Sequence, residues 1–98
     1  MIRVDIQPLA QVEAESAAQW YEKQQPGLGL EFILELDAAV DRAAQGPERY
    51  SVQYRSARRV LLRRFPYAVY FTLAGDHIEI FAVLHQRQAP STWESRSG

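Results

Sequence analysis

The sequence predicts an α+β fold in which an antiparallel sheet packs against an N-terminal helical hairpin. Apolar residues recur at helical spacing in two segments between residues 9 and 43, and after Tyr50 the apolar period changes to two. The chain has 98 residues, of which 47% are hydrophobic and 23% charged, a length and composition typical of one folded domain. We therefore expect residues 1–98 to form a single domain with the order β-α-α-β-β-β and a short C-terminal helix or tail.

The N-terminal segment predicts a short strand that leads into a helix. Apolar and charged residues alternate through IRVDI at positions 2–6, which is the period of a half-buried strand, and Pro8 suits the first position of a helix. Helical spacing then continues through residues 9–24. The apolar or small positions of this stripe are Leu9, Val12, Ala17, Trp20 and Tyr21. We expect Trp20 and Tyr21 to pack between the helix and the sheet.

The second helix carries the most regular apolar stripe in the chain. The segment QQPGLG at 24–29 interrupts the first helix, and the new stripe runs from Phe32 to Ala43. It stops at Gly46-Pro47, where glycine suits a left-handed cap and proline prevents continuation. Because the break is short, the two helices are predicted to lie antiparallel as a hairpin.

Three strands are predicted in the second half of the chain. Residues 60–65, 68–73 and 78–84 are rich in β-branched and aromatic residues, and AGD at 74–76 supplies the turn between the last two. Pro66 cannot donate to a sheet ladder, so it marks the end of the first of these strands.

Both faces of the last predicted strand carry apolar side chains. Strict alternation places Ile78, Ile80, Ala82 and Leu84 on one face, and Glu79, Phe81, Val83 and His85 on the other. We expect one face to cover the helices and the other to be shielded by another part of the molecule. Beyond this strand, Ser91 and Glu94 have the spacing of a capping box, which predicts a short terminal helix or turn.

Composition excludes several classes of site. The chain has no cysteine, which excludes a disulfide framework, a thiolate nucleophile and a cysteine-based zinc site. With only two histidines and no acidic residues clustered at ligand spacing, we expect neither a metal nor a cofactor. No segment has the pattern of a signal peptide or a membrane span, so we expect a cytoplasmic protein with no membrane partner.

The net charge of −1 hides two halves of opposite sign. Residues 1–48 contain three basic residues against nine acidic ones, a net charge of −6, whereas residues 49–98 contain eight arginines against three acidic residues, a net charge of +5. A surface for an acidic partner is therefore expected in the second half. The arginines at its centre are Arg55, Arg58, Arg59, Arg63, Arg64 and Arg87. Strand alternation groups Arg64 with Val60 and Leu62 among core-facing positions, where a guanidinium needs a partner or a function.

Three stretches resemble toxins of the RelE/ParE superfamily. They are RRFPYAVYF at 63–71, IEIFAVLHQRQAPSTWESR at 78–96, and AAQWYEKQQPGLGLEFILELDAAV at 17–40, the last being similar to the helical hairpin of the ParE side. The resemblance extends over nearly the whole chain. It implies a RelE/ParE-like fold and a growth-inhibiting toxin of a bacterial type II toxin–antitoxin module, a class associated with plasmid stabilization. A cognate antitoxin would wrap over the toxin and neutralise it, and DNA would be contacted only through that antitoxin.

The ParE side of the superfamily implies binding to DNA gyrase, which needs no catalytic residues. We favour this interpretation, and therefore a protein-binding inhibitor over an enzyme, because arginine pairs with carboxylates in a bidentate manner and is enriched with aromatic residues at binding hot spots. The residues expected to contact partners are Arg58, Arg59, Arg63, Arg64, Phe81, His85, Arg87 and Trp93.

The RelE side implies a ribosome-dependent mRNA endonuclease instead. His85 would be the base, Arg64 and Arg87 the cation donors, and a tyrosine the acid. The candidate acids are Tyr54, Tyr67 and Tyr70. Proteins that hold RNA are usually strongly basic, whereas this chain has one lysine, Lys23, in its acidic half.

A third possibility is a non-toxic protein that only binds its antitoxin. Both histidines also have simpler explanations. His85 would be a hydrogen-bonded residue that fixes the end of a strand, and His77, beside a turn, would be solvated.

Overall fold

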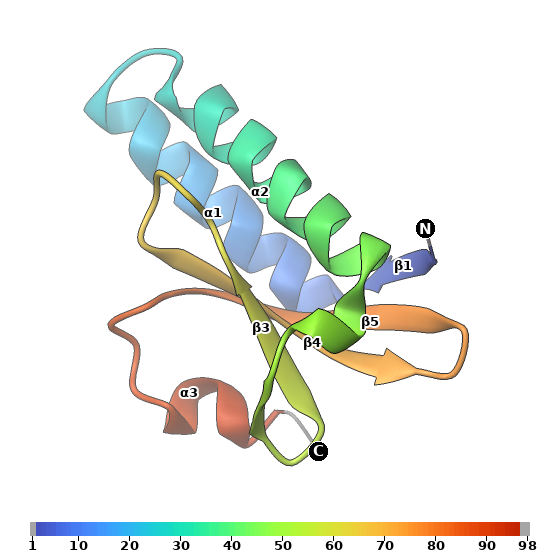
Figure 1. Cartoon of the computed structure of the whole chain (residues 1–98). Helices are drawn as coiled ribbons and strands as arrows, with labels where there is room; N and C mark the ends of the chain where they lie inside the picture. The colour runs from blue at the N-terminus through green and yellow to red at the C-terminus, as the bar shows by residue number, and fades with distance from the viewer. Residues whose placement is uncertain (1, 97–98) are drawn as a thin grey trace.

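The computed structural model describes residues 2–96, and its helices and strands follow the predicted order with one additional strand (Figure 1). The elements are β1 (Arg3–Ile6), α1 (Pro8–Gln24), α2 (Leu28–Gln45), a 3-10 turn (Pro47–Arg49), β2 (Val52–Tyr54), β3 (Ala57–Leu61), β4 (Tyr67–Ala74), β5 (His77–His85) and α3 (Ser91–Glu94).

The five strands form one mixed sheet in the order β1-β5-β4-β3-β2. β1 runs parallel to β5, with Arg3 opposite His77 and Ile6 opposite Ile80, while all the other neighbouring pairs are antiparallel. The α+β class is therefore confirmed, but the prediction of a wholly antiparallel sheet is wrong at the β1 edge. That pairing joins the first and last strands of the chain, and the pattern of neither strand encodes it.

The helical hairpin is closed by contacts at its tip. α1 begins at Pro8, as predicted, and Gly27 adopts the left-handed conformation, with φ of 90°, before α2. The carboxylate of Glu22 accepts hydrogen bonds from the backbone N–H groups of Gly27 and Gly29 at 3.0 and 3.1 Å, so α1 caps the N-terminus of α2. A Cβ at Gly29 would lie 2.7 Å from the carbonyl oxygen of Ala18, which shows how closely the helices approach there.

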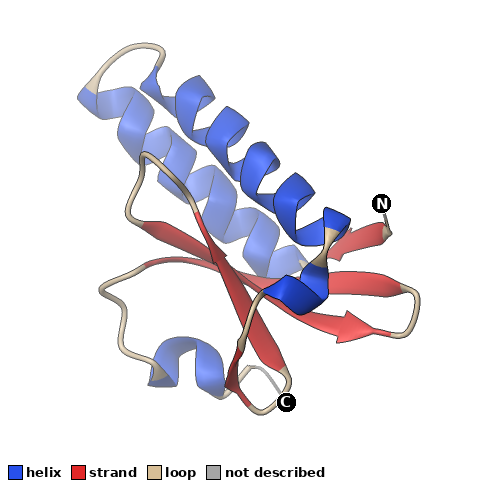
Figure 2. Cartoon of the chain, in the orientation of Figure 1, coloured by secondary structure: helices blue, strands red, loops and turns tan. Residues whose placement is uncertain are grey.

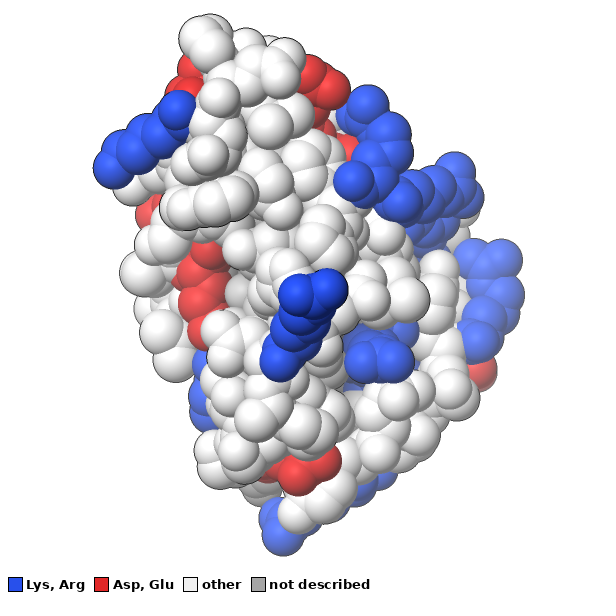
Figure 3. All heavy atoms as spheres, turned by 90° about the vertical axis from the view of Figure 1, so that its left-hand side faces the viewer, with Lys and Arg blue, Asp and Glu red and all other residues white. Residues whose placement is uncertain are grey.

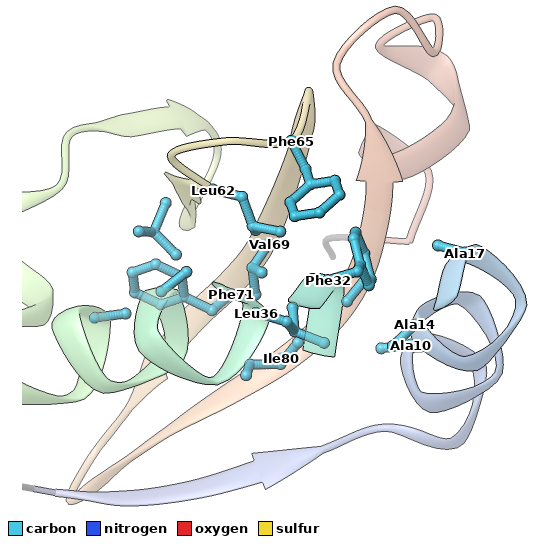
Figure 4. Close-up of a cluster of buried hydrophobic side chains, with 14 of the residues drawn as sticks. Ala10, Ala14, Ala17, Phe32, Leu36, Leu62, Phe65, Val69, Phe71 and Ile80 are labelled. Carbon is cyan, nitrogen blue, oxygen red and sulfur yellow. The ribbon is translucent and has the colours of Figure 1, made fainter. Parts of the chain in front are cut away.

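The main core lies between the helical hairpin and one face of the sheet (Figure 4). Phe32 of α2 belongs to this cluster together with Phe71 and Ile80 of the sheet, and all three side chains are almost fully buried. A second cluster on the opposite face contains Tyr70 and Trp93, and α3 contributes the tryptophan (Figure 2). The expectation that both faces of the sheet are covered is met by this short helix.

A β-bulge in β5 overturns the predicted assignment of its faces. Tyr70 lies opposite Ala82 while the next residue, Phe71, lies opposite Ile80, so Phe81 is an extra residue in the ladder. Phe81 and Ala82 therefore share a face, and the alternation is shifted by one position from Ala82 onward. Ile78, Ile80 and Val83 join the main core, whereas Phe81, Ala82 and Leu84 join the second cluster.

The first predicted strand of the second half is also corrected. β3 ends at Leu61, and residues 62–66 form an irregular connection to β4 in which Leu62 donates to the carbonyl oxygen of Tyr67 at 3.0 Å. β2, which the sequence did not predict, pairs with β3 through an irregular register. Three residues are too few for a periodic signal.

Candidate functional site

The arginine-bearing loops gather at one end of the sheet. The connection 62–66 carries Arg63 and Arg64, and the turn after β5 carries Arg87. These two loops are joined by a hydrogen bond from the backbone N–H of Gln86 to the carbonyl oxygen of Pro66 at 2.8 Å. Figure 3 shows this side of the molecule, where basic side chains are spread over a largely uncharged surface and acidic side chains are also visible. We call the surface formed by these two loops the arginine end.

A cleft of about 350 Å³ lies between α1 and the last residues of β5, next to the arginine end. Its wall includes Trp20, which is 56% exposed, together with Tyr67 and His85. The other lining residues are Val12, Glu13, Ser16, Ala17, Val83, Leu84 and Gln88. No arginine lines this cleft. It can therefore hold an apolar or aromatic group, with the cations supplied by the neighbouring loops.

His85 is held at the end of β5. Its Nδ1 accepts a hydrogen bond from the backbone N–H of Arg87 at 3.0 Å, and its ring meets the ring of Tyr67 edge to face at a centroid distance of 5.3 Å. An Nδ1 that accepts places the proton of the neutral imidazole on Nε2. This geometry agrees with the simpler explanation of His85 as a residue that fixes the strand end.

Tyr67 retains its proton well above neutral pH. Burial raises the pKa of its phenol above the ordinary value, and the neighbouring Tyr21 raises this pKa further. The phenol is therefore a hydrogen-bond donor in the cleft under physiological conditions.

Arg64 does not face the core, which corrects its predicted position. Because β3 ends at Leu61, strand alternation no longer applies, and the Arg64 side chain is 60% exposed. Its Nη1 lies 3.3 Å from Glu31 and its Nε lies 3.6 Å from Glu35, both on α2. The charge of Arg64 is thus largely matched by the helical hairpin.

The remaining arginines are divided among different surfaces. Arg58 donates to the carbonyl oxygen of Tyr50 at 2.7 Å, and its buried Nε has no hydrogen-bond partner in the structure. Arg59 is half-buried and follows Arg58 on β3, so it points to the opposite face of the sheet. Arg63 and Arg87 are exposed, and their guanidinium groups have no partner among residues 2–96.

Two predicted partner contacts are buried within the chain. Phe81 is 2% exposed, because it packs in the second cluster with Tyr70 and Trp93. Trp93 is 5% exposed and stacks on Tyr70 with ring centroids 4.5 Å apart. In this structure neither side chain is accessible to a partner, since α3 folds back over that face of the sheet.

The prediction for the aromatic pair on α1 is correct for only one member. Tyr21 packs against Phe65 and Phe32, with ring centroids 4.8 and 5.4 Å apart. Trp20, its neighbour, points outward to the cleft. Trp20 lies eight positions after Val12, about two helical turns, and both residues line the cleft. This spacing could have indicated that the two side chains lie on the same outer face of α1.

Sequence reasoning also missed two polar clusters. Glu13 of α1 accepts a hydrogen bond from the backbone N–H of Val83 at 3.0 Å and pairs with Arg96 at 2.9 Å. His77 is not simply solvated, because its two ring nitrogens lie 3.3 Å from Asp5 and 3.2 Å from Asp76. Both clusters join distant segments, so no local pattern reveals them.

The structure offers no arrangement for a metal ion among the residues that it describes, since no group of three or more His, Cys, Asp or Glu side chains is suitably placed. Within the same residues, none of the helices is long and apolar enough to cross a membrane.

Comparison with known proteins gives a family and a fold. A family model described as "ParE toxin of type II toxin-antitoxin system, parDE" matches residues 4–90. A solved structure titled "Chromosomal ParDE TA system from P. aeruginosa" is similar with a TM-score of 0.77 and 17% identity, over 87% of this chain and 96% of that one. No curated protein sequence is significantly similar to the chain. The structural likeness shows the fold, and the family match covers most of the chain.

Proposed function

This chain belongs to the ParE toxin family of type II toxin–antitoxin systems, and from that membership we propose that it inhibits growth by binding DNA gyrase and is neutralised by a cognate antitoxin. The arginine end and the adjoining cleft form the contact surface for these proteins.

The observation that carries this proposal is the exposure of Arg63 and Arg87 beside an aromatic cleft. Two cations without partners among the described residues favour an acidic ligand surface, and guanidinium groups pair with carboxylates in a bidentate manner. Trp20 provides a large apolar surface next to them. Arginine and tryptophan are the side chains most enriched at hot spots of protein interfaces.

The first experiment compares growth arrest and gyrase inhibition by matched variants. Arg63→Ala/Arg87→Ala removes two exposed cations of the arginine end, and Arg3→Ala/Arg49→Ala removes two cations from β1 and the 3-10 turn. If each arginine contributes about 0.7 kcal/mol or more, the first variant needs at least about tenfold more protein for half-inhibition of supercoiling. The control variant inhibits like the wild type. Equal inhibition by both variants would show that the arginine end does not contact gyrase.

The second experiment tests neutralisation by the antitoxin and uses the protein encoded by the neighbouring gene. Co-expression with that protein restores growth, and the purified pair forms a complex that the Arg63→Ala/Arg87→Ala variant weakens. If expression of the chain alone leaves growth unchanged, the non-toxic antitoxin-binding protein is the better description.

One observation favours the mRNA endonuclease as a second candidate. His85 and Tyr67 lie side by side in the cleft, and the tyrosine keeps its proton, as a general acid must. Arg64, one of the two cation donors expected for that reaction, instead pairs with Glu31 and Glu35. Codon-linked cuts in mRNA that disappear in His85→Ala, together with unaffected gyrase supercoiling, would establish the nuclease and reject the gyrase proposal.

A further inference from the structure

A second hollow lies on the helical hairpin, away from the arginine end. Between α1 and α2 the structure leaves an apolar slot of about 150 Å³ that reaches down to the sheet. Ala10 and Ala14 form its α1 wall, Leu36 and Val40 form its α2 wall, and Val83 contributes to its floor. The slot exists because the α1 side chains at this point are only methyl groups. We call it the interhelical slot.

The volume of the interhelical slot suits one apolar side chain. Pockets for metabolites and drug-sized ligands usually measure about 300–1,000 Å³, whereas an apolar cavity of about 150 Å³ accepts a benzene ring. A single Phe or Leu side chain therefore fits, and a larger ligand does not. An anchor side chain in a pocket of this kind is the usual centre of a protein–protein contact.

The rim of the slot carries negative charge. Glu15 of α1 and Asp37 of α2 line it from opposite sides, together with Gln11, whose amide donates to Glu15 at 3.2 Å. Asp37 has no partner among residues 2–96, and Glu15 has only this neutral one.

The other carboxylates of the hairpin are mostly engaged elsewhere. Glu13 pairs with a cation, Arg96. Glu31 and Glu35 share another, Arg64. Glu22 bonds to backbone N–H groups at the hairpin tip, and Asp41 of α2 has no partner among residues 2–96. Glu15 and Asp37 at the slot are therefore two of the four hairpin carboxylates that have no cation within the described part of the chain.

We propose that the interhelical slot binds a basic segment of a partner protein, which inserts one Phe or Leu side chain between Ala14 and Leu36 and places a flanking Lys or Arg against Glu15 and Asp37. Apolar walls supply the affinity, and the two carboxylates supply the preference for a cation. This site differs in position and in charge from the arginine end, so it does not depend on the function proposed above.

The test uses three capped tripeptides and the intact chain labelled at its alanine methyl groups. Ac-Lys-Phe-Lys-NH2 combines the anchor with positive charge, Ac-Glu-Phe-Glu-NH2 reverses the charge, and Ac-Lys-Gly-Lys-NH2 lacks the anchor. We expect the first peptide to shift the NMR signals of Ala10 and Ala14, with a Kd about tenfold lower than that of either other peptide, since two surface ion pairs each contribute modestly.

Two variants and a matched control separate this binding from non-specific association. Ala14→Leu fills the slot and abolishes the shifts at Ala10, whereas Ala38→Leu, the same change at an exposed position of α2, leaves them unchanged. Glu15→Gln/Asp37→Asn changes only surface groups and reduces the preference for the basic peptide to about twofold or less. This charge variant keeps the test valid if Ala14→Leu does not fold.

Several results would overturn the proposal. They are equal binding of the acidic and basic peptides, shifts confined to the cleft beside Trp20, or unchanged binding in both slot variants. None of these results bears on growth arrest or gyrase inhibition, because those assays report on the arginine end.

Discussion

Glu13 is predicted to be the polar residue whose loss destabilises the fold most. β1 pairs with β5 only as far as Ile80, and beyond that residue the backbone at the edge of β5 bonds to side chains. The Glu13 carboxylate accepts the backbone N–H of Val83 at 3.0 Å and two guanidinium N–H groups of Arg96 at 2.9 and 3.1 Å. Arg96 in turn donates to the carbonyl oxygen of Phe81. Helix α1, the sheet edge and the C-terminal tail are thus joined through one carboxylate.

The expected cost follows from the burial of this pair. Removing one partner of a fully buried ion pair costs about 3–5 kcal/mol. The side chains of Glu13 and Arg96 are 18% and 22% exposed, so water compensates part of the loss. We expect Glu13→Ala to lower the free energy of unfolding by about 2–3 kcal/mol. Glu13→Gln keeps an acceptor for the Val83 N–H and is expected to cost about half as much.

Urea unfolding followed by circular dichroism measures these differences, with Glu15→Ala as the control. Glu15 lies on the same helix and bonds only to Gln11, so its replacement should change the free energy of unfolding by no more than about 0.5 kcal/mol. A double-mutant cycle of Glu13→Ala with Arg96→Met should give a coupling energy of about 1–2 kcal/mol. A coupling near zero, or equal effects of Glu13→Ala and Glu15→Ala, would refute this reasoning.

Three further predictions concern packing and ionisation. Gly29→Ala should destabilise the protein by about 1–3 kcal/mol in urea melts despite the better helix propensity of alanine, because the new Cβ would lie 2.7 Å from a carbonyl oxygen of α1. Trp93→Ala should cost about 3–5 kcal/mol, whereas Trp20→Ala at an exposed site should cost less than about 1 kcal/mol; similar costs would contradict the assigned role of α3. Burial raises the pKa values of Tyr21 and Tyr67, so as the pH rises these phenols lose their protons in the unfolded chain before they do in the folded chain. The contribution of the two neutral phenols to the free energy of unfolding is therefore fully present below about pH 10 and declines as the pH rises through the raised pKa values. Spectrophotometric titration at alkaline pH should show tyrosines that ionise at a higher pH than the others, and Tyr67→Phe should have one fewer of them. Ionisation of all tyrosines at the same pH would contradict the prediction.

Local signals were sufficient to predict most of the fold. Pro8 begins α1, α2 ends before Gly46-Pro47, and the turn at 74–76 joins β4 to β5, as the sequence indicated. The expected left-handed cap at Gly46 is wrong, because its φ is −165°. Each of these signals acts through the backbone conformation of one or two residues. The parallel pairing of β1 with β5 depends instead on residues more than 70 positions apart. No periodicity within either strand specifies such a neighbour.

The bulge at Phe81 shows how one residue changes the assignment of a site. Alternation in β5 was predicted correctly up to Phe81, and from Ala82 to Leu84 each side chain lies on the opposite face from the predicted one. A bulge leaves no clear mark in an apolar segment, because valine, alanine and leucine suit either face. Phe81 itself keeps its predicted face, opposite Ile80, and is buried because the cluster that contains Trp93 of α3 covers that face.

The sequence shows which half of the chain carries an excess of each charge, but it does not show which charged side chains lie together on the folded surface. Arg64 lies 33 positions from Glu31 in the sequence, and the two side chains form an ion pair. This pair neutralises one positive charge of the expected basic surface and one negative charge of the hairpin. Such pairs cancel charge only where the fold brings the two halves into contact. The charges that remain without an ion pair among residues 2–96 include Arg63 and Arg87 at the arginine end, and Asp37 and Asp41 on α2. Under the two proposals above, an acidic partner binds the arginine end and a basic partner binds the interhelical slot, because opposite charges steer association. The two partners therefore need not compete for one surface.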